Sequence, residues 1–198
     1  CPGLTVKFED KVNEQSYTWR YVAGIRDYLI DAVKDMVALP EQPFVGAFSA
    51  SNEAADWAVL WLPEGGELVT ESYVNLIPTA QGGTHVNGLR QGLLEALRDF
   101  CEFRNLLPRG IKLTPEDVWD RCAYILSLKM QEPQFAGQTK ERLSSRQAAS
   151  FVTGVVKDSF SLWLNEHTDI AQQLAEFCIN NAQKRLRAEK KIVRKKVT

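Results

Sequence analysis

Residues 71–97 read ESYVNLIPTAQGGTHVNGLRQGLLEAL, which is a strand pattern, a glycine turn and a helix pattern in direct succession. The strand pattern covers residues 68–77, where neither alternating face is uniformly apolar. We therefore expect its second face to meet something polar or only part of a helical layer. After the glycines, leucines recur at three- and four-residue steps and predict a helix over residues 87–106. This stretch thus predicts a sheet with helical cover.

The segments before this stretch predict two hairpins with one helix between them. Residues 4–8 and 17–21 alternate apolar and polar side chains on either side of a polar connection, which is a hairpin pattern. A helix is expected over residues 24–39, where a Leu-Pro pair ends its apolar stripe. Residues 44–50 and 57–62 are short, rich in aromatic and β-branched residues, and predict the second hairpin.

The segments after the stretch predict three helices and one strand. Thr114 and Pro115 start a short helix, because a hydroxyl N-cap, a proline at the first position and two acids follow one another there. We expect an α+β fold with a small sheet covered on one face. The remaining expected elements are a buried strand at residues 123–130, a loop at 131–139, a helix from Ser144 or Ser145 to about Asn165, and a last helix from Thr168.

Length and composition indicate a globular protein. The chain has 198 residues and 44% hydrophobic residues, so it can bury a sizeable core, and no apolar run reaches the length of a membrane span. It fits one domain, or one domain plus an extension. The first three residues carry no initiator Met and no basic or apolar leader, so we interpret the chain as a fragment of a longer protein.

Charge distribution and cysteine spacing indicate possible partners and the cellular compartment of this globular protein. Residues 184–198 hold eight Lys and Arg residues against the single acid Glu189, whereas the rest of the chain is acidic. That end is interpreted as a stalk exposed to solvent and DNA, or as a frayed tail. The four cysteines are far apart without CxxC spacing, which favours buried reduced thiols in the cytoplasm over a zinc site or disulfides: Cys1, Cys101, Cys122 and Cys178.

The glycine turn is the first motif with chemical potential. Gly82 and Gly83 permit positive φ, and the helix amides that follow suit an anion. The alternative is a tight turn with Thr84 or Asn87 as a helix cap. A metal site is not expected at His85, because the only other histidine, His167, is distant in the sequence.

The second motif is the sequence FAGQTK at residues 135–140. Gly137 gives flexibility, Gln138 offers an amide, and Lys140 is a compact cation of the kind that binds phosphate as a point charge. The alternative is an ordinary solvated lysine. A Walker A loop is absent from the sequence, so this is not a P-loop.

Together, ESYVNLIPTAQGGTHVNGLRQGLLEAL and SLKMQEPQFAGQTKERLSSR resemble the GGTH and QTK motifs of type II DNA topoisomerase transducer domains, in the right order and over essentially the whole chain. Their wording is more similar to the topoisomerase IV branch than to the gyrase branch. The resemblance implies a fold like the second domain of ribosomal protein S5, with a small mixed sheet, a left-handed βαβ crossover and a long C-terminal helix. It divides the chain into the end of a GHKL ATPase domain (1–22), the transducer (23–166) and a long basic helix toward a TOPRIM domain (167–198).

The resemblance also implies a function, which is to couple ATP binding and hydrolysis to DNA strand passage. Gln138 and Lys140 are the positions that match the QTK residues reaching the γ-phosphate of ATP, as catalytic and nucleotide-binding groups. Mg²⁺ and the rest of the ATP site belong to the preceding domain, so the fragment alone is expected to be inactive.

DNA contacts are implied on two elements. Arg90 matches an arginine that lines the hole receiving the transported duplex, while Arg98 and Arg104 have the alternative of a solvated helix face. Implied partners are double-stranded DNA, the A subunit of topoisomerase IV and a second copy of the longer chain, in an A2B2 heterotetramer. The competing hypothesis is an S5-like nucleic-acid-binding module without an ATP role. The basic end would supply further phosphate contacts: Lys184, Arg185, Arg187, Lys190 and Lys191.

Overall fold

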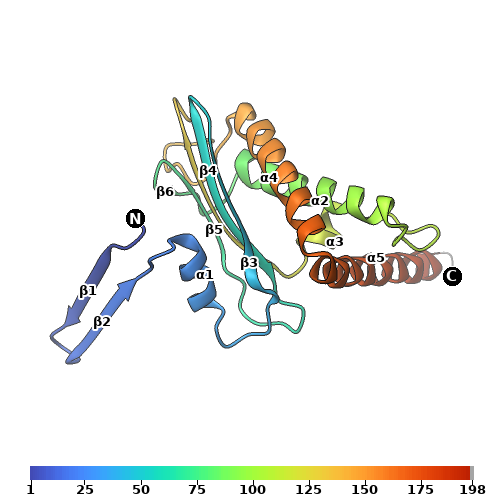
Figure 1. Ribbon diagram of the computed structural model, residues 1–198, viewed down its shortest axis with the longest axis horizontal. Helices are drawn as coiled ribbons and strands as arrows, with labels where there is room; N and C mark the ends of the chain where they lie inside the picture. Colours follow the sequence, from blue (N-terminus) through green and yellow to red (C-terminus); the bar gives the residue numbers. More distant parts are fainter. Residues whose placement is uncertain (197–198) are drawn as a thin grey trace.

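A five-stranded mixed sheet forms the centre of the molecule in the computed structural model, which describes residues 1–196 and the side chains of residues 1–190 (Figure 1). The strand order is β3-β4-β7-β5-β6, and only the β5–β7 pair is parallel. The parallel pair requires a crossover, which the helices between β5 and β7 supply. The strands are β3 (Leu39–Ser49), β4 (Glu53–Trp61), β5 (Thr70–Val74), β6 (Ile77–Pro78) and β7 (Cys122–Met130).

Helices cover both faces of this sheet, although the larger layer lies on one side (Figure 1). The larger layer consists of α2 (Thr84–Phe103), α4 (Arg146–Glu166) and the first half of α5 (Thr168–Lys196), and α1 (Ile25–Ala32) lies on the other face. Successive side chains of β4 point to opposite faces of the sheet, which explains this arrangement. Trp57 and Trp61 belong to the larger core, while Leu60 packs in the smaller core with Leu29 of α1. The α+β class is confirmed, whereas the expectation of helices on one face only is wrong.

The pair α2 and α4 packs at unusually close range. A Cβ atom added to Gly88 would lie 2.6 Å from the Ala149 carbonyl oxygen, and one added to Gly92 would lie 2.8 Å from the Thr153 carbonyl oxygen. Glycines one turn apart therefore let the backbone of α4 rest directly on α2. This close packing favours movement of the two helices as one body.

A separate hairpin at the N-terminal end confirms the first predicted strand pair. It consists of β1 (Thr5–Asp10) and β2 (Gln15–Arg20), and it projects away from the sheet (Figure 1). Phe8, Tyr17 and Trp19 are partly exposed and pack on one another along it. A lone two-stranded hairpin is marginally stable in water, so this aromatic surface is poorly protected in the described chain.

Several element boundaries differ from the sequence prediction by a few residues, and two of the differences change the elements themselves. The helix that opens at Gly24 ends at Ala32, and the Leu-Pro pair expected to end it instead begins β3. The strand expected over residues 68–77 is divided into β5 and β6, because Asn75 and Leu76 adopt positive φ values of 49° and 67°. The Asn75 side chain compensates by donating to the Met130 carbonyl at 2.9 Å and accepting from its N–H at 3.0 Å.

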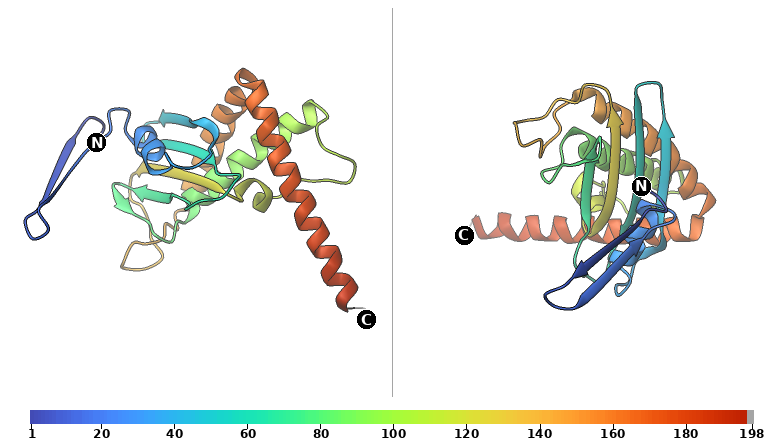
Figure 2. Two further views of the ribbon diagram at one scale, coloured as in Figure 1. Left: turned by 90° about the horizontal axis from the view of Figure 1, so that it is seen from below. Right: turned by 90° about the vertical axis from the view of Figure 1, so that its left-hand side faces the viewer.

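The final helix divides into a packed half and a projecting half. Its first part contributes buried residues such as Leu174 and Cys178 to the larger core, and its last part extends beyond the body of the protein (Figure 2). Among the helices described, none combines the length and the apolar character that a membrane span requires. The predicted final helix is thus confirmed, and its basic end projects from the body.

Candidate functional site

The structure joins the two sequence motifs, which lie far apart in the chain. Leu143 donates its N–H to the Gly82 carbonyl at 3.0 Å and accepts from the Thr84 N–H at 3.1 Å. The Gln81 N–H donates to the Glu141 carbonyl at 2.9 Å, and the Gln81 amide donates to the Glu141 carboxylate at 2.8 Å. The glycine turn is therefore hydrogen-bonded along its length to the segment that follows the FAGQTK loop.

Only glycine fits at the centre of this junction. Gly83 has a φ of 134°, and a Cβ atom there would overlap the Leu143 carbonyl oxygen and lie 2.5 Å from the Leu143 nitrogen. At the start of the helix, the Thr84 N–H binds Leu143, and the first bond within the helix runs from the Asn87 N–H to the Gly83 carbonyl. The contacts with Leu143 make this motif a tight turn, although the residue that caps the helix is Gly83.

His85 holds the same turn against the sheet. Its side chain is fully buried, and its Nε2 lies 3.1 Å from the Thr79 hydroxyl, which in turn donates to the Ser72 carbonyl at 2.9 Å. Burial lowers the pKa of His85 to about 4, so the ring is neutral at pH 7. Where the structure is described, no three His, Cys, Asp or Glu side chains form a metal-binding group. We assign His85 a structural role in the turn.

This buried histidine makes stability depend on pH. The unfolded chain protonates His85 below about pH 6.5, whereas the folded chain does so only near its lowered pKa of about 4. The free energy of unfolding is therefore highest, as far as His85 is concerned, above pH 6.5. It falls as the pH drops toward 4, by about 2 kcal/mol at pH 5. Urea unfolding at pH 7 and pH 5 measures this drop in the free energy of unfolding. The drop should be mostly absent in His85→Gln and should persist in His167→Gln, which changes an exposed histidine. The same drop in both variants would contradict the structural role of His85.

The FAGQTK loop combines a fixed base with an exposed tip. At the base, the Ala136 N–H donates to the Arg142 carbonyl at 2.9 Å, and the Gln134 N–H donates to the Ser145 hydroxyl at 2.9 Å. At the tip, Gln138 and Lys140 are both exposed. Lys140 has a φ of 58°, a conformation that is uncommon for lysine. An exposed ammonium and an exposed amide on an anchored loop suit a phosphate group brought by another domain.

A second candidate site is a hollow of about 590 Å³ between α2, α5 and the short helix α3 (Pro115–Trp119). It unites three of the residues that the sequence assigned to DNA binding, namely Arg90, Lys184 and Arg185, although they come from separate elements. Three acidic residues line it together with four basic ones. The sequence did not indicate that these three basic residues lie together, or that Arg121 and acidic residues line the same hollow. The charged residues of the lining are Arg90, Glu116, Asp117, Asp120, Arg121, Lys184 and Arg185.

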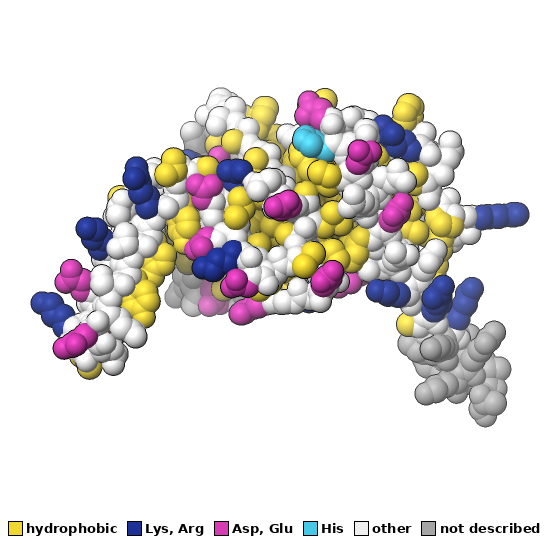
Figure 3. Space-filling model, turned by 60° about the horizontal axis from the view of Figure 1, so that its bottom comes forward, with side chains coloured by type: hydrophobic (Ala, Val, Ile, Leu, Met, Phe, Trp, Pro, Cys, Tyr) yellow, Lys and Arg dark blue, Asp and Glu magenta, His cyan; other side chains and the backbone are white. Residues whose placement is uncertain are grey.

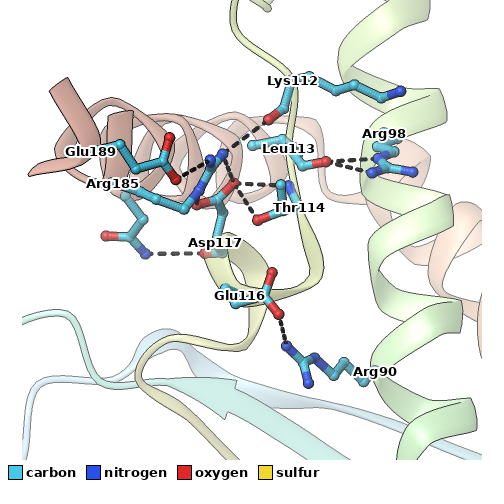
Figure 4. Close-up of polar contacts among 10 residues, drawn as sticks. Arg90, Arg98, Lys112, Leu113, Thr114, Glu116, Asp117, Arg185 and Glu189 are labelled. Atoms are coloured by element: carbon cyan, nitrogen blue, oxygen red, sulfur yellow. Dashed lines mark hydrogen bonds and ion pairs between the residues drawn. The ribbon is translucent and has the colours of Figure 1, made fainter. Parts of the chain in front are cut away.

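Two arginines of this hollow each contact an acid of α3 (Figure 4). Arg90 donates one Nη2 hydrogen bond of 2.7 Å to Glu116, and its Nε atom, which is buried, finds no partner among the described residues. Arg185 donates from Nε and Nη2 to the two oxygens of Asp117, at 2.9 and 3.0 Å. Burial acts to raise the pKa of Asp117, but hydrogen bonds from Arg185 and Thr114 outweigh it and the pKa is lowered.

The Asp117 contact connects α5 to the body of the protein. The Asp117 side chain is only 2% exposed, and its backbone carbonyl also accepts from Asn181 at 3.1 Å. Its carboxylate also accepts from the backbone N–H of Thr114, the predicted N-cap, at 2.8 Å and so forms a capping box. The Arg185 guanidinium that the sequence assigned to DNA is thus occupied by a structural contact that fixes the direction of α5.

The other predicted basic residues fall into two groups. Arg98 donates to the Leu113 carbonyl at 2.9 Å and Arg104 lies 4.9 Å from the Phe100 ring centre, so both belong to the helix surface and its packing. Lys and Arg side chains cluster around the projecting half of α5 (Figure 3). The side chain of Lys191 lies outside the described residues. The exposed basic residues of this cluster are Lys184, Arg187 and Lys190.

The fold and these sites define a class of protein. The chain belongs to the DNA gyrase B family, whose model matches residues 24–193. It is 68% identical to the B subunit of DNA topoisomerase 4 from Salmonella typhimurium and 66% identical to that from Escherichia coli over all 198 residues, but it spans only 31% of the length of either relative. The resemblance to the topoisomerase IV branch is therefore confirmed.

Solved structures give the same family. The topoisomerase IV ATP-binding domain of Francisella tularensis, in complex with a small-molecule inhibitor, matches 94% of this chain with a TM-score of 0.79 and 38% identity. The 43K ATPase domain of Thermus thermophilus gyrase B, in complex with an aminocoumarin, matches 96% of the chain with a TM-score of 0.82 and 25% identity. The chain covers 50% and 51% of those two structures.

Proposed function

We propose that this chain couples ATP to DNA strand passage, as the transducer part of a longer type II topoisomerase subunit. The observation that carries the proposal is the junction at Gly83 and Leu143, which joins the FAGQTK loop to the start of α2. The loop also leads directly into α4, which packs on α2 through Gly88 and Gly92. A loop that senses a nucleotide would therefore move the helix that carries Arg90.

Gln138 and Lys140 are the residues proposed to contact the γ-phosphate of ATP. Bound ATP supplies a terminal phosphoryl group that is present before hydrolysis and absent afterwards. Lys140 binds that charge as a mobile cation and stabilises it as hydrolysis proceeds, while Gln138 donates from its amide. Because the contact depends on the phosphoryl group, it favours one orientation of the loop over another. Mg²⁺ and the remaining nucleotide contacts are assigned to a preceding GHKL-type domain.

The division of the chain follows from this proposal. We assign residues 1–22 to the end of the preceding domain, which the projecting hairpin and its partly exposed aromatic residues support. We assign residues 23–166 to the transducer, and residues 167–198, which include α5, to a segment that leads toward a TOPRIM domain. On this assignment the chain alone does not hydrolyse ATP, because it supplies only part of the site.

DNA is the proposed substrate of the whole assembly, which would decatenate duplexes and relax supercoils in the cytoplasm. The contacts would be phosphate contacts without sequence readout, made by Arg90 in the hollow and by Lys184, Arg187 and Lys190 on α5. Arg185 would act indirectly, by fixing α5 on α3. The proposed assembly is a heterotetramer of two copies of the longer chain with two A subunits of topoisomerase IV.

Arg90→Ala in the full-length protein tests the DNA half of this proposal. The slope of log affinity against log salt for duplex DNA should decrease in magnitude by about one, because one phosphate contact is lost. DNA-stimulated ATP turnover should fall with it. Arg104→Ala, at the residue that follows the end of α2, removes the same charge away from the hollow and should leave the salt slope and the DNA-stimulated turnover unchanged. A normal DNA response of Arg90→Ala would refute the assignment and favour a nucleic-acid module that uses other contacts.

A further inference from the structure

The two arginine contacts at α3 differ in a way that suggests different tasks. Asp117 is almost fully buried and receives two hydrogen bonds from Arg185. Glu116, the preceding residue, is 66% exposed and receives a single hydrogen bond from Arg90. A bidentate, buried pair is geometrically fixed, whereas an exposed single contact contributes little and exchanges easily. The Asp117 pair is therefore a permanent joint, and the Glu116 pair is exchangeable.

Arg90 is incompletely satisfied by its acidic partner. A guanidinium carries five N–H donors, and Glu116 accepts from only one of the nitrogens. The Arg90 side chain remains 31% exposed, and it lines the same hollow as Lys184. A carboxylate and a phosphate present similar anionic oxygens to a guanidinium, so either group can accept from the exposed side of Arg90.

We infer that Glu116 is an internal competitor that holds Arg90 until a phosphate of duplex DNA replaces it. The inference rests on the proposed DNA role of Arg90. It adds Glu116 as the residue that a DNA phosphate must displace before it can bind Arg90. Loose or single-stranded contacts gain little by displacing Glu116, whereas a duplex lying against the mouth of the hollow places several phosphates near Arg90 and Lys184 together. Strong binding is thereby restricted to duplex DNA that lies against the hollow.

The position of Glu116 also gives the exchange a structural consequence. Glu116 and Asp117 are successive residues of one short helix, and their side chains contact α2 and α5 respectively (Figure 4). When DNA takes Arg90, α3 loses its ion pair to α2 while its joint to α5 persists.

Glu116→Gln in the full-length protein tests this inference with a short mixed-sequence DNA duplex as the probe. The amide keeps the side-chain shape but removes the charge that competes with phosphate, so duplex affinity at low salt should rise about two- to fivefold. Glu102→Gln, an exposed residue of α2, makes the same charge change away from Arg90 and should raise affinity clearly less. Glu116→Asp keeps the charge but shortens the side chain, which weakens the contact with Arg90. Its duplex affinity should therefore rise, but less than that of Glu116→Gln.

The Arg90→Ala background separates this inference from the proposed function. There, Glu116→Gln should give no more gain than Glu102→Gln, because the contested guanidinium is absent. If Arg90→Ala weakens DNA binding but Glu116→Gln matches its control in the wild-type background, competition by Glu116 is refuted and the DNA role of Arg90 stands. If Arg90→Ala leaves DNA binding unchanged, the proposed function of Arg90 fails and the inference fails with it.

Discussion

Lys140→Ala in the full-length protein is expected to reduce ATP turnover by about 100-fold or more, which is the usual cost of losing one preorganised group that stabilises transition-state charge. The Lys140 side chain is exposed at the tip of an anchored loop, so its truncation should leave the fold intact. Steady-state ATP hydrolysis measures the loss, and the urea unfolding midpoint of the variant checks the fold.

The control for Lys140 is a lysine of equal charge outside the loop. Lys129 is exposed near the end of β7, and Lys129→Ala removes the same charge from a position outside the FAGQTK motif. It should retain nearly full turnover. Equal turnover in Lys140→Ala and Lys129→Ala would show that Lys140 does not act on the nucleotide, and it would leave the nucleic-acid-binding alternative.

Gly83→Ala is expected to lower the free energy of unfolding by about 3 kcal/mol or more. A residue with a side chain is strained by about 1–3 kcal/mol at a φ of 134°, which is a glycine conformation. At Gly83 the added methyl group also overlaps the Leu143 backbone, so either the two hydrogen bonds of the junction or the glycine turn must yield. Urea unfolding with a constant m value measures the loss.

Gly137 provides a closely matched control for the backbone strain. It has a φ of 136°, but a Cβ atom there meets no atom within 4 Å. Gly137→Ala should therefore cost only the strain, about 1–3 kcal/mol, and the excess in Gly83→Ala reports the contact with Leu143. Equal losses in the two variants would mean that the close approach of Leu143 adds no cost beyond the backbone strain.

Periodicity in the sequence predicted the elements of this fold more reliably than their ends. The leucine spacing after the glycine turn predicted the helix α2, and the apolar run at residues 123–130 predicted the buried strand β7. The break at Asn75 was not predictable, because it depends on the contacts of the Asn75 side chain with Met130 on β7. The second helical face was missed because β4 is apolar on both faces, so its sequence shows no alternation of apolar and polar residues.

The candidate sites show the same division between local and tertiary information. The sequence predicted that Thr114 starts a helix, and the capping box with Asp117 confirms it. It could not show that the same carboxylate accepts from Arg185, since that contact joins residues on separate elements. Nor could it show that Leu143 closes the glycine turn. The family resemblance supplied roles for Gln138 and Lys140, which stay predictions.

The proposed coupling depends above all on Lys140 sensing the terminal phosphate of ATP. A structure of the full-length protein with a non-hydrolysable ATP analogue examines this contact, with the ADP complex as the comparison. We expect Lys140 Nζ within hydrogen-bond distance of a γ-phosphate oxygen in the first complex, and a solvent-exposed Lys140 in the second. A fully occupied nucleotide whose γ-phosphate is held entirely by other residues, with Lys140 equally exposed in both complexes, would refute the proposed coupling.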